Sequence, residues 1–401
     1  MDTQSVFLLD GELRIRPYVS KVQLKEIALK CFGLELDENV KPVEMVSYDD
    51  RNFRVQGRLK NDDITRKFVL KIFNFGSAPK LSMELAVDLL IRCGEQCSDY
   101  LKVSTPIKSL QNGHSTENVE FISSFDIPVL EFASYNNCTK EDLIETGALR
   151  VGTSGEVTCR HHVRLLTYLE GRVPDFCKDN LTDSFVRHWG ATCARICNAF
   201  EGEAKSEGDR GGWIWNLVTC PQYLTEDYLS TCIKDHEQRK VLSSIIREFE
   251  TETLPLLKKH LKMSYIHNDL NEANLLVSAN DSIDGVLDFD DIAWSFPVVD
   301  LGICMMYLSL ASQEEDIFHN LNLLYKGFTS TRCLNDVEDS ALYNICLLRY
   351  AEVTVISLYQ HEFVDPDNDY LLLHTADNFK RIDYLRSAGP TIFKKRVCSE
   401  D

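Results

Sequence analysis

The spacing of apolar residues along the chain changes near residue 165, and the change separates two kinds of secondary structure. Before this point, short alternating and apolar runs predict strands beside two amphipathic helices. The predicted elements are a helix at 20–33, strands at 47–55 and 67–73 joined by a turn at 61–63, and a helix at 81–93. The stretch 94–161 is long and polar, with a strand near 119–125, and residues 105–160 are interpreted as an insertion.

The second part of the chain is predicted to be mostly helical. Residues 163–169 form a last strand-like run, which ends at a turn of Glu170 and Gly171. Helical periodicity then continues almost to the end. The predicted helices are 183–200, 222–232, 236–262, 297–326, 338–361 and 367–387. The sequence therefore predicts an α+β, bilobal protein with a small strand-rich lobe over 1–165 and a larger helical lobe over 166–401.

Composition and charge narrow the class of protein. The chain has 401 residues, with 43 Lys and Arg against 62 Asp and Glu, which gives a formal net charge of −19. Nucleic acids and anionic membranes attract basic surfaces, so neither is expected as a partner. The start of the chain has no positively charged segment before its apolar run, and residues 298–311 are too short to span a bilayer. The 14 cysteines show no metal-site spacing, and we expect reduced thiols in a cytoplasmic protein.

The segment 264–291 contains the residues with the most specific chemistry. It reads SYIHNDLNEANLLVSANDSIDGVLDFDD, in which His267, Asp269 and Asn274 precede a predicted hairpin of two short strands. Antiparallel pairing of these strands places Asn274 beside Asp288, with Asp269 one loop away. Amide and carboxylate oxygens are ligands that Mg²⁺ prefers. We therefore predict a Mg²⁺-assisted phosphoryl transfer in which Asp269 takes the proton of an acceptor hydroxyl.

The same chemistry needs a cation on the phosphates of the nucleotide. Lys71 stands in the apolar strand F-V-L-K-I, and Glu84 on the next helix is its predicted partner. The segment 47–55 would cover the phosphates, with Ser47 and Asn52 as candidate contacts. Each residue alone also has an ordinary structural explanation, since a strand lysine can extend its amine to solvent. The combination is what indicates a kinase.

These motifs resemble the hydroxylysine kinase branch of the aminoglycoside phosphotransferase and choline kinase-like family. The resemblance extends beyond the catalytic loop to six further segments. They are S-Y-D-D-R-N-F from Ser47, F-V-L-K-I from Phe68, V-R-L-L-T-Y-L-E-G-R from Val163, W-I-W-N-L from Trp213, L-R-Y from Leu348 and N-D-Y-L from Asn368. It implies a protein-kinase-like fold and covers nearly the whole chain outside residues 105–160.

The resemblance also implies the reaction and the roles of single residues. The expected donor is GTP, with GTP and ATP not distinguishable from these residues, and the expected acceptor is the hydroxyl of 5-hydroxy-L-lysine. Family roles carried over by position give Asp269 as catalytic residue, Asn274 and Asp288 as metal ligands, and Lys71 with Glu84 at the phosphates. Thr167, Tyr168 and Leu169 match the hinge, where backbone groups contact the purine.

The charges of hydroxylysine suggest its binding residues. Two ammonium groups and one carboxylate call for acidic groups and one arginine. Asp291, beside the predicted metal site, and Arg349 are the candidates, although Arg349 has Glu352 as an alternative partner three residues on.

Two other functions remain open, one of them because of a departure from the family pattern. Asp290 replaces the family's usual glycine, which restricts the backbone if a positive φ is needed there. A nucleotide-binding pseudokinase is therefore one alternative. A kinase of another amino-alcohol, such as choline, ethanolamine or an aminoglycoside, is the second. A protein kinase is not expected, since no A-P-E follows Asp288, and the chain has no P-loop motif.

Overall fold

The computed structural model divides the chain into two compact units. Unit 1 comprises residues 1–87, 104–169 and 363–365, and unit 2 comprises residues 88–103, 170–362 and 366–401. The structure describes residues 4–9, 12–15, 17–47, 50–60, 62–76, 79–110, 120–129, 132–134, 140–176, 181–278, 282–363, 366, 368–372, 375 and 377–399. The predicted functional boundary at 165/166 stays a prediction. By contacts, the chain passes into unit 2 after Leu169, and residues 88–103 also group with unit 2.

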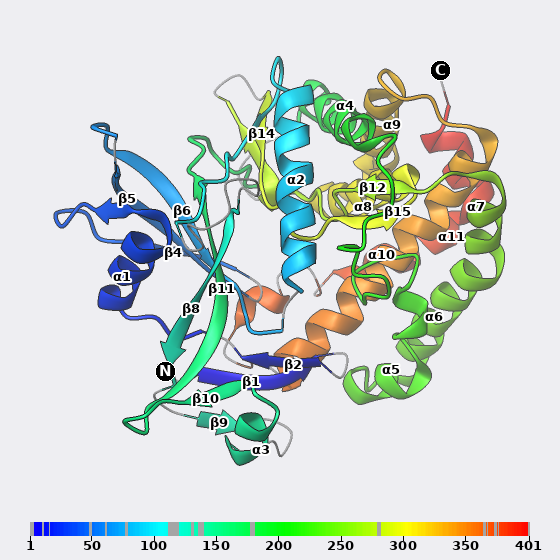
Figure 1. Cartoon of the computed structure of the whole chain (residues 1–401). Helices are drawn as coiled ribbons and strands as arrows, with labels where there is room; N and C mark the ends of the chain where they lie inside the picture. Colours follow the sequence, from blue (N-terminus) through cyan, green and yellow to red (C-terminus); the bar gives the residue numbers. More distant parts are fainter. Residues whose placement is uncertain are drawn as a thin grey trace. The chain divides into compact units, whose positions relative to one another are not determined.

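Unit 1 is built on an antiparallel sheet. Its strands are β3 (Leu34–Leu36), β4 (Val43–Met45), β5 (Arg51–Leu59), β6 (Arg66–Ile72), β8 (Ile122–Pro128), β10 (Leu149–Val151) and β11 (Val157–Thr167). The main order is β10-β11-β6-β5-β3, with β4 paired to β5 and β8 to β11. The long strand β11 runs through this sheet (Figure 1). A smaller sheet joins β1 (Gln4–Leu9), β2 (Glu12–Ile15) and β9 (Phe132–Ser134), and α3 spans Lys140–Glu145. The predicted β5–β6 hairpin is confirmed.

The first predicted helix is confirmed as α1 (Lys21–Phe32). Ser20 caps its start, because the Ser20 side chain accepts the N–H of Gln23 and the Gln23 side chain accepts the N–H of Ser20. Gly33 ends the helix at φ +67°, a conformation that glycine adopts without strain. The buried face of α1, with Leu24 and Ile27, packs into the core of the sheet.

The polar stretch 94–161 contributes strand β8 to the main sheet, while its interpretation as containing an insertion stays a prediction. Strand β8 pairs with β11 over seven residues, from Thr158 opposite Pro128 to Arg164 opposite Ile122. Ile127 of β8 is fully buried in the same core as α1. These residues are therefore part of the main sheet. Residues 111–119 and 135–139 of the predicted insertion lie outside the described residues.

Unit 2 is mainly helical and confirms the predicted α+β organisation. Its helices are α4 (Asp183–Phe200), α5 (Glu226–Cys232), α6 (His236–Glu248), α7 (Leu254–His260), α8 (Pro297–Ala311), α9 (Ile317–Thr329), α10 (Asp336–Phe363) and α11 (Asn378–Val397). Its short strands are β7 (Lys102–Val103), β12 (Ser264–Ile266), β13 (Leu275–Val277), β14 (Ile283–Val286) and β15 (Ala293–Ser295). Helix α2 (Lys80–Gln96) contains the division between the units. The helix predicted at 297–326 is wrong as one element, because Ser312 ends α8 and α9 starts at Ile317.

Two glycines let α4 and α9 pack closely. A Cβ added to Gly190 would lie 2.0 Å from the carbonyl oxygen of Leu324, and one added to Gly327 would lie 2.0 Å from that of Arg187. Such distances are far below van der Waals contact, so only glycine fits at either position. The helix pair in turn supports the catalytic loop, since the indole N–H of Trp189 on α4 donates to the carbonyl of Leu270 at 3.2 Å.

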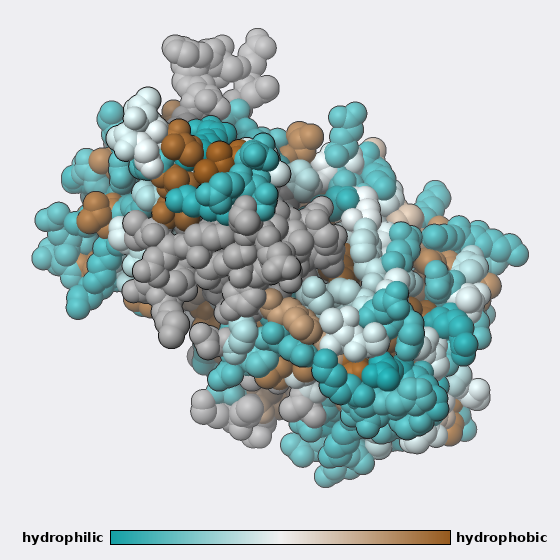
Figure 2. Space-filling view, turned by 90° about the horizontal axis from the view of Figure 1, so that it is seen from below, coloured by the Kyte–Doolittle hydropathy of each residue, from teal (hydrophilic) through white to brown (hydrophobic). Residues whose placement is uncertain are grey.

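The helix α10 combines length with an apolar composition. By these criteria it could cross a membrane, but 89% of its most apolar window is buried inside the protein, which is what a core helix shows. Among the residues coloured in Figure 2, hydrophilic side chains predominate on the face shown, and hydrophobic ones form small groups. This surface agrees with the acidic, charge-rich composition.

Candidate active site

The predicted catalytic loop, residues 267–274, starts where β12 ends, and Asp300 holds it in place. The carboxylate of Asp300, in the first turn of α8, accepts the backbone N–H of His267 at 2.8 Å and that of Asn268 at 2.7 Å. Asn268 has φ +68°, so these bonds fix a backbone conformation that is unfavourable for most residues. Asp300 is fully buried, and burial raises its pKa to about 6. Its role is therefore structural.

Two thiols lie beside Asp300. Cys197 Sγ is 3.8 Å from Asp300 Oδ2, and Cys193, Cys197 and Asp300 place their possible ligand atoms within 4.8 Å of one another. The spacing of the cysteines did not predict this group. Both oxygens of Asp300 already accept backbone N–H groups, so loop anchoring accounts for its burial without a metal.

His267 connects the loop to the hairpin. Its Nε2–H donates to the carbonyl oxygen of Leu287 at 3.1 Å, and its Nδ1 faces the N–H of Asp269 at 3.4 Å. Burial lowers the pKa of His267 to about 4, so the ring is neutral at pH 7. The imidazole thus orients backbone groups.

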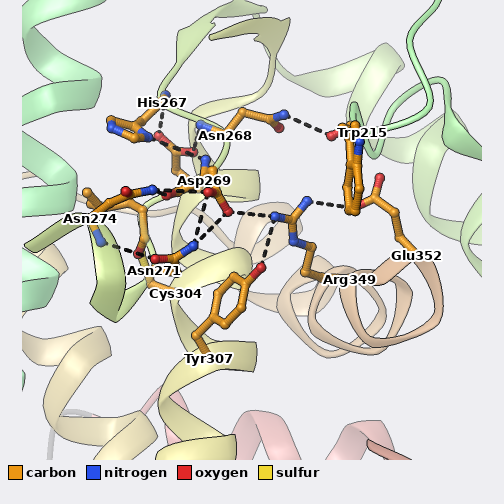
Figure 3. Close-up of polar contacts among 12 residues, drawn as sticks. Trp215, His267, Asn268, Asp269, Asn271, Asn274, Cys304, Tyr307, Arg349 and Glu352 are labelled. Atoms are coloured by element: carbon orange, nitrogen blue, oxygen red, sulfur yellow. Dashed lines mark hydrogen bonds and ion pairs between the residues drawn. The ribbon is translucent and has the colours of Figure 1, made fainter. Parts of the chain in front are cut away.

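Asp269 lies at the centre of a polar network in unit 2 (Figure 3). Asn271 donates through Nδ2 to both carboxylate oxygens, at 3.1 and 3.0 Å, and Asn274 donates to Oδ2 at 3.0 Å. Asn274 also donates to the Asp269 carbonyl at 2.8 Å. The side chain of Asp269 keeps 19% of its surface exposed, and desolvation raises its pKa. Asn271 was not among the predicted site residues, although an asparagine two residues after an aspartate is a common turn signal.

The predicted hairpin is confirmed, and it brings Asn274 next to the segment that carries Asp288. Leu275 pairs with Val286, and the N–H of Leu287 donates to the carbonyl of Asn274 at 2.9 Å. Asp288 follows with φ +52°. Because the Asn274 side chain donates to Asp269 through Nδ2, its Oδ1 stays suited to a metal ion. Together with the Asp288 carboxylate this is an oxygen donor set that fits Mg²⁺.

The backbone at Asp290 does not need the positive φ that would have made an aspartate unfavourable there. Within the described ranges, the non-glycine residues with positive φ are Asn268 and Asp288, and Asp290 is not among them. A side chain at 290 therefore carries no left-handed strain. Arg210 donates to the carbonyl of Asp290 at 3.0 Å, which fixes this turn.

Arg349 reaches Asp269 from α10, but its role differs from the predicted one. Its Nη2 donates to Asp269 Oδ1 at 2.8 Å, and its Nη1 donates to Glu352 Oε2 at 2.6 Å. The guanidinium is thus neutralised by two carboxylates, and the pairing with Glu352 foreseen as an alternative is present. The predicted carboxylate-binding role is not what this arrangement favours. Burial is the main cause that raises the pKa of Asp269 and of Glu352, and the charge of Asp291 raises both further.

In unit 1, Lys71 is buried and has a different partner from the one predicted. Its ammonium lies 3.2 Å from Asp50 Oδ2, whereas Glu84 pairs with Lys80 at 3.3 Å. The expected Lys71–Glu84 pair is therefore wrong in this structure. Glu84 lies one helical turn from Lys80 and pairs with it on the same helix. Asp50, just before the strand beside Lys71, is left to pair with Lys71.

The cross-strand neighbour of Lys71 is Asn52, another predicted nucleotide contact. The Oδ1 of Asn52 is buried and has no hydrogen-bond partner within the described part of the chain. Ser47 is half-buried and precedes Tyr48 and Asp49, which lie outside the described residues. Asn52 and Lys71 thus share one face of the β5–β6 pair, while the predicted role of Ser47 stays a prediction.

Two backbone donors of the predicted hinge are bonded within unit 1. The N–H of Thr167 donates to the carbonyl of Thr105 at 2.9 Å, and the N–H of Tyr168 donates to the carbonyl of Lys67 at 3.1 Å. The predicted contacts of Thr167, Tyr168 and Leu169 with a purine through backbone groups stay a prediction.

Comparisons with known proteins show what the whole chain is similar to. Residues 140–322 match the model of the phosphotransferase enzyme family. A hydroxylysine kinase from Xenopus laevis is 25% identical over 398 residues, covering 95% of this chain and 93% of the relative. A solved amicoumacin kinase in complex with AMP-PNP, Ca²⁺ and Ami has a TM-score of 0.58 at 15% identity, covering 95% of this chain and 96% of that one.

A second solved structure shares the fold to the same degree. A microcompartment-associated aminopropanol kinase has a TM-score of 0.58 at 15% identity and covers 94% of this chain and 97% of that one. The predicted family resemblance and the protein-kinase-like α+β fold are thereby confirmed. The chain resembles the phosphotransferase enzyme family over residues 140–322, and it is a kinase that transfers a phosphoryl group to an alcohol.

Proposed function

We propose that this kinase transfers the γ-phosphoryl group of GTP to the hydroxyl of 5-hydroxy-L-lysine. The observation that carries the chemistry is the convergence of Asp269, Asn274 and the hairpin that ends at Asp288. The choice of donor and acceptor is supported by the sequence resemblance and by the relative named hydroxylysine kinase, which matches 95% of the chain.

The residues divide the reaction between them. Asp269 accepts a hydrogen bond from the acceptor hydroxyl, aims its oxygen at the γ-phosphorus and takes its proton as the P–O bond forms. The bond from the γ-phosphorus to the bridging oxygen breaks, and GDP leaves. Asn274 and Asp288 would hold Mg²⁺, which supplies positive charge against the phosphate oxygens when bound. Lys71 is assigned to the nucleotide phosphates.

The electrostatics of the site support an acceptor with ammonium groups. The charge of Arg349 is matched by Asp269 and Glu352, and Asp288 and Asp291 add negative charge that raises the pKa of Asp269. A negative field of this kind attracts cationic groups and repels free carboxylates. Both ammonium groups of hydroxylysine would be favoured here.

One observation favours a second candidate acceptor. Arg349 already forms ion pairs with two carboxylates, so it is poorly suited to bind the carboxylate of an amino acid. An amino-alcohol without a carboxylate, such as choline or ethanolamine, would not need such an arginine. The fold and the catalytic residues would be the same for both acceptors.

The test is nucleotide consumption by the purified protein with Mg²⁺ and either GTP or ATP. The parallel acceptors are 5-hydroxy-L-lysine, L-lysine, choline and ethanolamine, and mass spectrometry identifies the phosphorylated product. Turnover of hydroxylysine but not lysine is the expected result. Turnover of choline or ethanolamine alone would overturn the acceptor, and nucleotide binding without turnover would favour a pseudokinase. Asp269→Asn is the matched control, in which transfer should be lost.

We also propose that the protein works in the cytoplasm. In the part of the chain that the structure describes, the cysteines are free thiols, and most are buried. Reduced thiols are typical of cytosolic proteins. Microscopy of a tagged chain in its own cell type would test this.

A further inference from the structure

Helix α10 presents a buried ion pair to the catalytic loop. Arg349 and Glu352 are three residues apart and lie on one face of the helix, where their side chains meet. The side chain of Arg349 is 3% exposed and that of Glu352 is fully buried. Placing two charges in such surroundings costs several kcal/mol of desolvation. A buried ion pair is therefore weak evidence for a role in stability. Its place next to Asp269 points to a role at the site.

We propose that Arg349 and Glu352 are positioning residues that hold the Asp269 carboxylate in the orientation needed for transfer. The proposal rests on the proposed function, in which Asp269 takes the proton of the acceptor. It assigns Arg349 to the catalytic carboxylate instead of to the substrate.

The geometry of the guanidinium is the first argument. Its two terminal nitrogens serve two different carboxylates, Nη2 toward Asp269 at 2.8 Å and Nη1 toward Glu352 at 2.6 Å. Nη2 also contacts the hydroxyl of Tyr307 at 3.1 Å. The planar arginine fork therefore bridges α10 and the loop, with Glu352 fixing its far end (Figure 3). A lysine lacks this rigid planar fork, because its ammonium is a single compact charge on a flexible stem.

Aromatic rings enclose the same guanidinium. Its central carbon lies 5.5 Å from the ring centroid of Trp215 and 5.6 Å from that of Tyr307. These contacts favour a cation and restrict the arginine rotamer. Trp215 also joins the network through its backbone, since its carbonyl accepts the side-chain N–H of Asn268 at 2.8 Å. Arg349 and Glu352, called the clamp below, are thus connected to the loop at two points.

The donors around Asp269 complete the argument. Asn271 and Asn274 belong to the loop itself and approach the carboxylate from the same short segment. Arg349 is 80 residues away in sequence and supplies a bond from a separate element. Two directions of restraint are needed to fix a carboxylate that can turn about its last torsion. Misplacement of a reacting group by about 1 Å can cost roughly 10²-fold in rate.

The experiment compares Arg349→Lys and Glu352→Gln with matched variants of a remote pair. Arg386 and Glu248 lie 3.3 Å apart in unit 2, so Arg386→Lys and Glu248→Gln make the same chemical changes away from the site. The measurements are kcat and KM for whichever acceptor is turned over, and the Kd of the nucleotide. We expect a kcat loss of about tenfold or more at the clamp. The KM and Kd should change less than about twofold, and the remote variants should match the wild type.

A folding defect is excluded by a paired replacement. In Arg349→Met with Glu352→Leu, both charges are removed together, which often leaves stability unchanged or improved. This double variant should fold with a normal melting temperature and still lose kcat. If it does not fold, the pair belongs to the stability of the core and the proposal is overturned.

Two further outcomes would overturn the proposal. One is a kcat close to the wild-type value in both single variants. The other is a raised acceptor KM at unchanged kcat, which would make Arg349 a substrate-binding residue. Asp269→Asn separates this inference from the proposed function. An inactive Asp269→Asn beside active clamp variants removes only the inference, whereas an active Asp269→Asn removes the proposed base as well.

Discussion

Replacing Asp300 by alanine should release the catalytic loop. The carboxylate accepts two backbone N–H groups, from His267 at 2.8 Å and from Asn268 at 2.7 Å, and it is fully buried. In Asp300→Ala both donors lose their acceptor in a place that water does not reach. In Asp300→Asn one oxygen is kept, but the amide N–H₂ faces a backbone N–H, so one of the two bonds is lost.

The magnitude follows from these two bonds. An unsatisfied buried donor costs about 1–3 kcal/mol, so Asp300→Ala should lose about 2–6 kcal/mol of unfolding free energy and Asp300→Asn about half of that. The loss of kcat should be larger than the loss of unfolding free energy alone would cause. Asn268, at φ +68°, loses the bond that holds it in an unfavourable conformation, and Asp269 is the next residue. A shift of about 1 Å there corresponds to roughly 10²-fold in kcat.

The assay combines urea unfolding with steady-state kinetics well below the melting temperature of each variant. Ser309→Ala is the control, because Ser309 is on the same helix and is buried, but its hydroxyl bonds to Tyr350 instead of the loop. It should lose about 1 kcal/mol and keep its kcat. A folded Asp300→Asn with kcat within about threefold of the wild type would refute the reasoning.

Three further predictions follow from other parts of the molecule. Lys71→Met should raise the nucleotide Kd at least about tenfold in a titration, and an unchanged Kd would remove Lys71 from the phosphate site. Gly190→Ala should lower the unfolding free energy by about 3 kcal/mol, since its Cβ would lie 2.0 Å from the carbonyl oxygen of Leu324; an unchanged urea midpoint would contradict the close packing. Burial lowers the pKa of His161 to about 4, so the unfolded chain binds the extra proton. Stability should fall by about 3 kcal/mol as the pH drops from 6.5 to 4, and His161→Gln should lack this loss in urea titrations at each pH.

Local pattern was sufficient to predict much of the fold. The helix α1 has its cap, its apolar face and its terminal glycine within 14 residues, so its bounds follow from short-range interactions. The same is true of the hairpin β13–β14, whose pairing brings Asn274 and the Asp288 segment together. The predicted single helix at 297–326 failed because the pattern stays helical on both sides of the break at Ser312, where the chain turns.

Only the tertiary structure decided which residues that are distant in sequence pair with one another. Lys71 pairs with Asp50 instead of Glu84, and Arg349 pairs with Asp269, 80 residues away. The sequence by itself determined much of the local secondary structure and the candidate residues for the chemistry, because hydrophobic periodicity and motif spacing are encoded over a few neighbouring positions. Which buried charge meets which is set by the packing of whole helices and strands. Desolvation makes an unpaired charge costly in the interior, so each such group takes the partner that packing brings within reach.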